Sequence, residues 1–223
     1  MAWMSIEDII FEDKDWTAPA CRDQEFNVTV FGGGGSGSAG TSIYGDNIGG
    51  AGGGSGEMKQ GTFILNEGTV IPCMVGAGGK GVKNSTRVCD YTGYSIGKSG
   101  GTTCFGTLLS ANGGTGGFFN RGGIGGHNGG STGGNAEGNF YGYGVTDTVN
   151  GRTFHSGGGG AAMNARGIGG QVGYGQGEGG PSAGGAGMFI TEIDGKRDIR
   201  IGSGGDGMIK IQYYIPVGDD DLL

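Results

Sequence analysis

Two glycine-rich stretches have the form of phosphate-binding loops. Residues 35–40 read Gly-Ser-Gly-Ser-Ala-Gly and follow a β-like segment, which matches the dinucleotide fingerprint. No helical period follows, although a helix amino terminus is what would hold the pyrophosphate. Residues 93–99 resemble a phosphate loop but have one residue too few between their glycines. In a chain with 61 glycines among 223 residues, such matches arise from composition, and we expect no nucleotide site.

The evidence for a metal site or a catalytic site in the sequence is equally weak. Asp206 lies in a Gly-Gly-Asp-Gly stretch that resembles a calcium-binding repeat, but the stretch occurs once and such sites need stacked copies. His127 and His155 lie in separate glycine segments, without a framed nucleophile or a paired carboxylate. We therefore expect no enzyme, no catalytic residue, no metal and no cofactor.

The four cysteines contain no Cys-x-x-Cys pair, and only two histidines could join them in a zinc site. We expect buried small apolar residues rather than zinc ligands or disulfides. Whether Cys89 and Cys104 pair is left open.

Aromatic, amide and basic residues gather between the glycine runs. Such side chains on a rigid scaffold are typical of recognition surfaces, because aromatic rings give large contact area at low entropic cost. The alternative is that they plug the ends of the scaffold as a minor core. The predicted receptor-binding residues, all expected in loops, are Phe118, Phe119, Arg121, His127, Tyr141, Tyr143, His155 and Tyr174.

Residues 1–23 differ from the rest because they have few glycines, both tryptophans and many acidic side chains. Ser5 and Asp8 resemble a weak capping box, and the isoleucines that follow predict one apolar face of a short helix. We interpret this region as a docking segment for a larger assembly, and folding back onto its own domain is the alternative. The predicted attachment residues are Trp3, Ile6, Ile9 and Trp16.

From Glu25 the apolar residues alternate with period two, which predicts a strand. Asn66–Thr69 predicts a tight hairpin between two of the strands, and Pro72 predicts that its strand lies near a sheet edge. The predicted strands are 25–31, 62–65, 70–75, 103–109 and 207–215.

The glycine segments between these strands often have two glycines in every three residues. Because glycine loses the most backbone entropy on folding, so many are expected only where backbones pack directly on backbones, or where nothing folds. A threefold rhythm fits an extended helix with three residues per turn, whose neighbours exchange N–H to C=O bonds. We predict a mainly β fold with irregular structure, in which short sheet elements flank a bundle of polyglycine-II helices and there is little α-helix. The predicted glycine-rich domain is 24–217, followed by an acidic tail at 218–223.

Charge and hydropathy argue against nucleic-acid binding, membrane insertion and secretion. A formal net charge of -7 without a basic cluster argues against nucleic acid. No apolar run approaches the ~18–20 residues of a membrane span, and the acidic start does not resemble a secretory signal. We therefore expect synthesis in the cytoplasm and no membrane insertion.

Four blocks of this chain share their order and spacing with a known family. The blocks are Phe26–Gly35, Lys59–Leu65 leading to Met74–Gly79, Gly100–Gly106 with Ser110–Gly114, and Gly205–Ile211. They resemble the glycine-rich domain of bacteriophage tail proteins over about 25–216, although Cys104 stands where that family more often has serine.

The resemblance implies a virion protein of the phage tail or tail fibre, an adhesin that binds a host receptor through distal loops. The receptor is expected to be an outer-membrane protein or a glycan, and residues 1–23 are expected to join other tail or tail-fibre subunits. The resemblance leaves two forms of assembly possible, a trimer or a cap on a trimeric fibre.

An ice-binding protein, or a purely structural glycine-rich tail or capsid protein, is the alternative function. An ice-binding face would show regular ranks of Thr or Ala, whereas the residues here are mixed.

Overall fold

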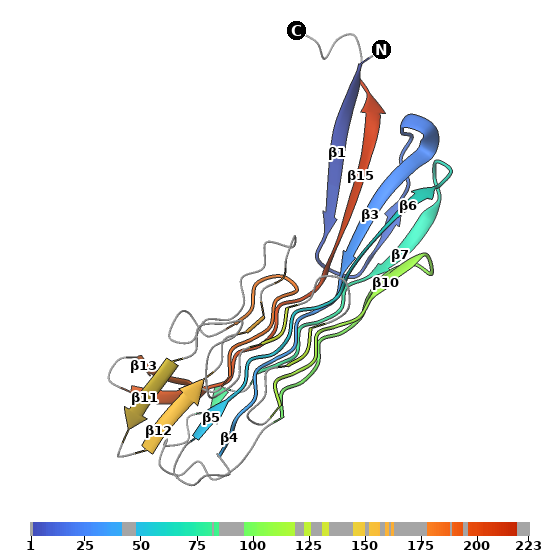
Figure 1. The fold of residues 1–223 in the computed structure, drawn as a ribbon. Helices are drawn as coiled ribbons and strands as arrows, with labels where there is room; N and C mark the ends of the chain where they lie inside the picture. Colours follow the sequence, from blue (N-terminus) through green and yellow to red (C-terminus); the bar gives the residue numbers. More distant parts are fainter. Residues whose placement is uncertain are drawn as a thin grey trace.

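The computed structural model describes residues 2–41, 48–81, 83–84, 96–118, 123–125, 131–133, 145–149, 152–156, 159–160, 162, 178–187, 189–193 and 196–217. The molecule is elongated, with a β-sandwich at one end, a bundle of extended glycine-rich segments in the middle and short strands at the far end (Figure 1). The first and last strands lie together in the sandwich, so the chain leaves and returns at the same end. The predicted mainly β fold is confirmed, and no α-helix occurs among the described residues.

The first sheet of the sandwich has the order β1-β15-β3-β6, with every neighbouring pair antiparallel. Its strands are β1 (Trp3–Ile10), β15 (Met208–Pro216), β3 (Glu25–Phe31) and β6 (Met58–Ile64). The second sheet has the order β10-β9-β7-β2 and is also antiparallel. Its strands are β10 (Leu109–Ala111), β9 (Thr103–Phe105), β7 (Val70–Met74) and β2 (Lys14–Thr17).

The core lies between these two sheets. Alternate residues of β3 and β15 are fully buried, as the period-two pattern predicts. Three rings form its centre, with the Trp16 ring edge-on to Phe26 at 5.2 Å and tilted against Phe105 at 5.7 Å between centroids. The buried set is Ile10, Trp16, Ala18, Phe26, Val28, Val30, Ile71, Cys73, Phe105, Ala111, Ile209, Ile211 and Tyr213.

Two expectations for the middle of the sandwich were wrong. The predicted hairpin at 66–69 does form a turn, with the Thr69 N–H bonded to the Asn66 carbonyl at 3.0 Å, but β6 and β7 then enter different sheets. The predicted strand 103–109 is instead a hairpin that turns at Gly106, whose φ is +52°. The alternation of residue types did not predict this turn, because apolar residues occur on both sides of it.

Pro72 does not mark an edge strand, since β7 lies between β9 and β2. The register pairs Cys73 with Phe105, the last residue of β9, so Pro72 lies beyond the end of that strand. The Pro72 carbonyl instead accepts the Gly106 N–H at 2.8 Å. Pro72 is tolerated because the ladder on that side has already ended and no partner carbonyl needs its missing N–H.

The predicted helix near the start of the chain is wrong, because residues 3–10 form β1 and pair along their whole length with β15. Residues 14–17 form β2, which pairs with β7 in the opposite sheet. Residues 1–23 therefore supply strands to both sheets, as in the alternative that the sequence left open. Apolar spacing alone could not distinguish the two periods, because Ile6, Ile9 and Ile10 fit a helix face and Ile6 and Ile10 also fit one face of a strand.

A partly buried carboxylate ties this first segment to the core. Asp8 Oδ2 accepts the Trp16 indole N–H at 2.9 Å and the Tyr213 hydroxyl at 3.2 Å. Burial, followed by the charge and the hydrogen bond of Asp8, raises the pKa of Tyr213 to about 12. These bonds join β1, β2 and β15, which come from opposite ends of the chain.

The raised pKa of Tyr213 predicts a loss of stability in alkali. Its folded pKa of about 12 exceeds the ordinary value of about 10, so its contribution is complete below pH ~10 and is lost as the pH rises towards 12. Tyr213→Phe has no such proton and loses only the bond to Asp8, about 1–2 kcal/mol at pH 8. Urea unfolding should show the gap between the two proteins narrowing from pH ~8 to ~12. A constant gap would contradict the assignment.

The central bundle is held by backbone hydrogen bonds with a period of three. Along residues 32–38, successive N–H groups bond in rotation to three antiparallel segments, and every third donor returns to the same one. The N–H groups of Gly32, Gly35 and Ser38 bond to the carbonyls of Glu57, Gly54 and Ala51, respectively. Those of Gly33 and Ser36 bond to Gly101 and Lys98, and those of Gly34 and Gly37 bond to Gly205 and Gly202.

Carbonyl groups of the same segment accept bonds from three further segments. The N–H groups of Gly114 and Gly117 bond to the carbonyls of Gly33 and Ser36, respectively. The N–H groups of Gly79 and Gly185 bond to the carbonyls of Gly34 and Gly35, respectively. Residues 32–38 thus form the centre of a bundle with six neighbours. The bonds repeat every three residues, and the polyglycine-II form of these segments stays a prediction.

Direct contact between backbones explains the glycines in this bundle. A Cβ added at Gly35 would overlap the Thr115 carbonyl, and one added at Gly53 would overlap that of Gly35. Similar overlaps with backbone atoms occur at glycines throughout the bundle. Glycine is therefore required by close approach rather than by turns, in agreement with the composition argument.

Polar residues in the bundle accept N–H groups that no neighbouring carbonyl reaches. Thr103 Oγ1 accepts the Gly76 N–H at 3.0 Å, and Ser36 Oγ accepts the Lys98 N–H at 2.8 Å. Glu57 is buried, with Oε2 accepting the Asn112 N–H at 2.8 Å and lying 3.5 Å from Lys59 Nζ. These side chains satisfy backbone donors that would otherwise be buried without a partner.

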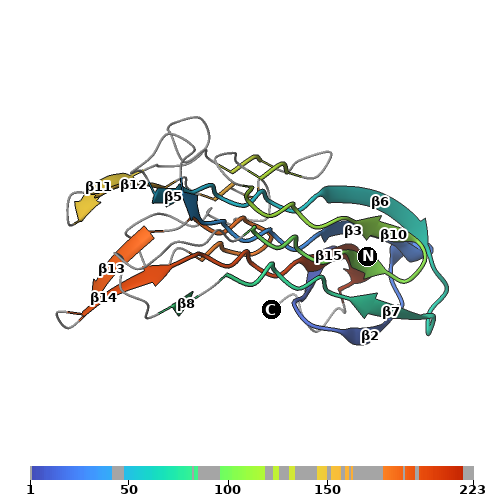
Figure 2. The same ribbon diagram turned by 90° about the horizontal axis from the view of Figure 1, so that it is seen from below.

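Short strands lie at the end of the bundle opposite the sandwich (Figures 1 and 2). One sheet has the order β11-β12-β5-β4, and the other has the order β13-β14-β8. Their strands are β4 (Gly40–Thr41), β5 (Ile48–Gly50), β8 (Lys83–Asn84), β11 (Val145–Val149), β12 (Arg152–Ser156), β13 (Phe189–Ile193) and β14 (Lys196–Arg200). The described residues contain no helical segment with the length and hydrophobicity of a membrane span.

Candidate recognition surface

Two β-hairpins form part of the distal end. β11 pairs with β12, and β13 pairs with β14, each antiparallel. The loop prediction for His155 is wrong, because His155 lies in β12, opposite Thr146 of β11 and Gly49 of β5. The signal for both hairpins was present in the sequence, since Asn150-Gly151 and Asp194-Gly195 separate the paired strands. Such dipeptides between strand-forming residues favour two-residue hairpin turns.

Exposed apolar side chains lie on three neighbouring segments towards this end. Phe118, a predicted site residue, is 54% exposed, and Ile96 and Ile124 are 52% and 68% exposed. The Gly97 N–H bonds to the Gly117 carbonyl at 2.8 Å, which places the Ile96 and Phe118 segments side by side. We call these three residues the distal apolar surface.

Ile124 is joined to the same group through Thr115. The Thr115 N–H bonds to the Ile124 carbonyl at 3.1 Å, and Thr115 Oγ1 bonds to the Ile124 N–H and carbonyl. Gly114 and Gly117, three residues apart, both donate to the central segment, so Thr115 and Phe118, also three apart, share another side of their own segment. Phe118 and Ile124 therefore belong to the same side of the bundle.

The sequence analysis includes Phe118 among the predicted site residues but neither of the two isoleucines. Ile124 stands alone in a Gly-Gly-Ile-Gly-Gly stretch, and Ile96 precedes a glycine. Gly97 and Gly123 contact neighbouring backbone so closely that an added Cβ would overlap it, which leaves little room inside the bundle for a large side chain beside them. Isolated large apolar residues within glycine runs could therefore have been predicted as exposed.

The remaining predicted receptor-binding residues fall outside the described residues, and their role stays a prediction. They are Phe119, Arg121, His127, Tyr141, Tyr143 and Tyr174.

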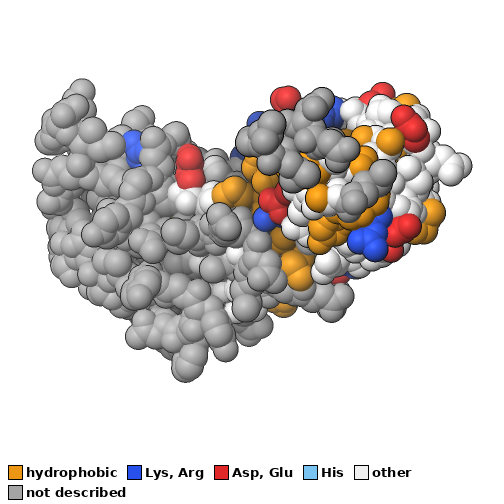
Figure 3. Space-filling view, turned by 90° about the horizontal axis from the view of Figure 1, so that it is seen from above, with side chains coloured by type: hydrophobic (Ala, Val, Ile, Leu, Met, Phe, Trp, Pro, Cys, Tyr) orange, Lys and Arg blue, Asp and Glu red, His pale blue; other side chains and the backbone are white. Residues whose placement is uncertain are grey.

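The predicted attachment residues divide between surface and core. Trp3 and Ile9 are 39% and 40% exposed, whereas Trp16 is buried and Ile6 packs against the core. Arg22 lies over the Trp3 ring, 5.6 Å from its centroid. Hydrophobic side chains interspersed with charged ones are visible on the sandwich end of the molecule (Figure 3). Trp3 and Ile9 are therefore the two attachment candidates that remain accessible.

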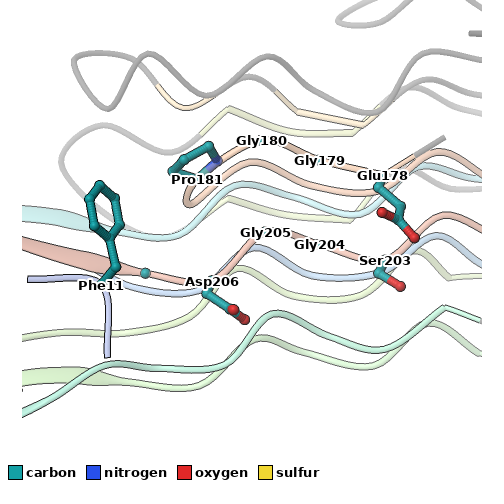
Figure 4. A pocket seen from close by; sticks show the side chains of 10 residues that line it. Phe11, Glu178, Gly179, Gly180, Pro181, Ser203, Gly204, Gly205 and Asp206 are labelled. Atoms are coloured by element: carbon teal, nitrogen blue, oxygen red, sulfur yellow. The ribbon is translucent and has the colours of Figure 1, made fainter. Parts of the chain in front are cut away.

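A hollow of about 410 Å³ lies at the junction of the sandwich and the bundle (Figure 4). Phe11 and Pro181 border it together with Glu178, Ser203 and Asp206. Asp206 Oδ1 accepts the Gly78 N–H at 2.7 Å, and Ser203 Oγ accepts the Gly81 N–H at 3.0 Å. Both side chains thus support the backbone of the neighbouring segment. Asp206 lies just before β15, but its side chain bonds to Gly78, which is distant in the chain.

The described cysteines are free thiols. Cys73 is buried, as predicted, and burial raises its pKa to about 11, whereas Cys21 and Cys104 are half-buried. A raised pKa disfavours the reactive thiolate. Among the described residues, no group of His, Cys, Asp and Glu could hold a metal ion.

Comparison with curated proteins finds no match for this chain. A family model described as a glycine-rich domain matches residues 12–214, which include β2 and nearly all of β15. β1 lies before the matched region, although it completes the first sheet. Since the match covers most of the 223 residues, the chain belongs to this glycine-rich domain family.

Proposed function

We propose that the protein is a bacteriophage tail or tail-fibre adhesin that binds a receptor on the host surface. The observation that carries the proposal is the separation of two ends by a hydrogen-bonded bundle. The sandwich end holds β1 and β15, and the other end presents the hairpins (Figure 1). The distal apolar surface is exposed on the bundle, away from the sandwich strands. Such a molecule can be held at one end and recognise a target at the other.

The bundle supports this proposal because it can hold the distal end rigidly. Successive residues of the central segment 32–37 donate their backbone bonds to different segments. Hydrogen bonds therefore connect the interior of the bundle in several directions. Exposed apolar residues on a rigid support lose little entropy when they bind a partner. The receptor is proposed to be a glycan or the exposed loops of an outer-membrane protein, because aromatic faces suit both.

A binding experiment tests the distal apolar surface. Labelled protein is first applied to a panel of bacterial strains, and its affinity for a bound strain is measured. Replacing Ile96, Phe118 and Ile124 together by serine should weaken binding at least about thirtyfold, because a central anchor typically contributes ~2 kcal/mol or more. The matched control replaces three similarly exposed residues of the sandwich end by serine, namely Ile64, Val70 and Met74, which are 67%, 55% and 55% exposed.

A further variant separates the distal apolar surface from the predicted loops. Tyr141→Ala with Tyr143→Ala should abolish adsorption without lowering the melting temperature if those loops contact the receptor. Binding that survives both sets of substitutions would contradict the proposed site. Binding to no strain, together with thermal hysteresis of the purified sample, would favour the ice-binding alternative.

A further inference from the structure

The outer edge of β1 is a long strand edge without a partner among the described strands. β1 has eight residues and is the terminal strand of its sheet, paired on one side with β15. In Figure 1 β1 lies at the outside of the sandwich. It contains no proline, lysine or bulge, which are the usual features that prevent an edge from pairing.

The register shows which backbone groups face outward. The Val217 N–H bonds to the Ala2 carbonyl at 3.0 Å, so the backbone groups of Ala2 point towards β15. Alternate residues of a strand point to opposite sides, and Trp3 lies opposite Pro216, which has no N–H to offer. The backbone groups that face the free edge are those of Trp3, Ser5, Glu7 and Ile9.

These four residues also have exposed side chains, whereas Ile6, Asp8 and Ile10 are half-buried or buried. The edge therefore has both unpaired backbone groups and an accessible row of side chains. That combination is suited to strand addition, in which main-chain bonds provide affinity and alternate side chains provide specificity.

We propose that β1 pairs antiparallel with β1 of a second copy of this chain, about a two-fold axis at Ile6. In this register Trp3 lies opposite Ile9 of the second copy, and Ser5 lies opposite its Glu7. All four outward-facing residues then occupy bonded positions. An aromatic and a β-branched residue form a favourable cross-strand pair on each side of the axis.

Charge repulsion and loss of pairing select this register over its two neighbours. Only shifts of two residues keep the outward-facing groups opposite one another. A shift in one direction places Glu7 opposite Glu7 of the second copy, and like charges in that position are destabilising. A shift in the other direction places Trp3 opposite Glu7 and leaves Ile9 without a strand partner.

The pairing would join the two first sheets into one continuous antiparallel sheet through the dimer. It is independent of the proposed receptor binding, because it uses the opposite end of the molecule. A two-fold interface of this kind uses the same surface on both copies.

Sedimentation equilibrium from about 1 to 100 µM protein, a range in which a moderate dimer would dissociate, tests the pairing. Ser5→Pro removes an outward N–H but no bond to β15, and it should weaken the dimer at least tenfold. Ser5→Ala keeps that N–H and should leave the dimer unchanged. Melting curves show whether each variant remains folded.

Charge at the same position gives a second, independent test. Ser5→Lys places a cation opposite Glu7 of the second copy and should tighten the dimer roughly fivefold, since the pair occurs twice. Ser5→Glu should weaken it by a similar factor. A monomer across the concentration range, a trimer, or equal effects of the two charges would overturn the proposal.

Discussion

Replacing Gly35 by valine is expected to prevent stable folding. Gly35 lies in the central segment of the bundle, where its N–H bonds to Gly54 and its carbonyl accepts the Gly185 N–H. An added Cβ would overlap the Thr115 carbonyl, and no flexible side chain there can move aside. Separating these backbones would break bonds to several segments, so we expect a loss of at least about 4 kcal/mol. Circular dichroism and urea unfolding measure the effect.

Ser99→Val is the matched control for this substitution. Ser99 is exposed on a segment that packs against the same central segment, and its neighbour Gly100 would clash with Gly33 if it carried a Cβ. The change at Ser99 should cost less than about 0.5 kcal/mol, as surface changes usually do. The same reasoning applies to Gly159, which is buried, more strongly than to Gly125, which is only half-buried. If Gly35→Val unfolds at the same urea concentration as the parent, the bundle is not held by backbone contact.

Replacing Trp16 by alanine is expected to cost about 3–5 kcal/mol. The ring is 6% exposed and packs against Phe26 and Phe105, and its indole N–H satisfies Asp8. The substitution leaves a cavity between the sheets and removes a hydrogen bond from a partly buried carboxylate. Thermal unfolding should show a large fall in melting temperature.

The other tryptophan provides the comparison. Trp3 is 39% exposed on an outer strand, so Trp3→Ala should cost no more than about 1 kcal/mol. Deletion of residues 1–23 should abolish folding rather than leave an intact domain, because it removes β1, β2 and Trp16 together. Equal effects of the two alanine variants, or a folded deletion variant, would show that the first segment lies outside the core.

Particular residues show how far local pattern could predict the fold. The alternation of Phe26, Val28 and Val30 predicted a strand with one buried face, and the structure confirms it. The same kind of reasoning failed at residues 6–10, where Ile6 and Ile10 fit both a helix face and a strand face, and at Gly106, where a turn interrupts the predicted strand. At residues 6–10 the deciding interaction came from β15, at the other end of the chain.

The candidate surface shows the same limit. Phe118 was predicted because aromatic residues are frequent in recognition loops, and it is exposed. Its association with Ile96 and Ile124 depends on which glycine segments lie side by side, and the hydrogen bonds between segments decide that. Glycine carries no side chain to specify a neighbour, so a single sequence contains little information about the pairing.

The sequence by itself determined the mainly β fold and the need for direct backbone contact, because these follow from residue type and local period. The tertiary structure alone decided that the first strand completes a sheet with the last, that Trp16 and not Trp3 enters the core, and that residues 32–38 lie at the centre of the bundle. The physical reason is that local period fixes how a segment presents its side chains and backbone groups. The partner that accepts those groups is chosen by the packing of the whole chain.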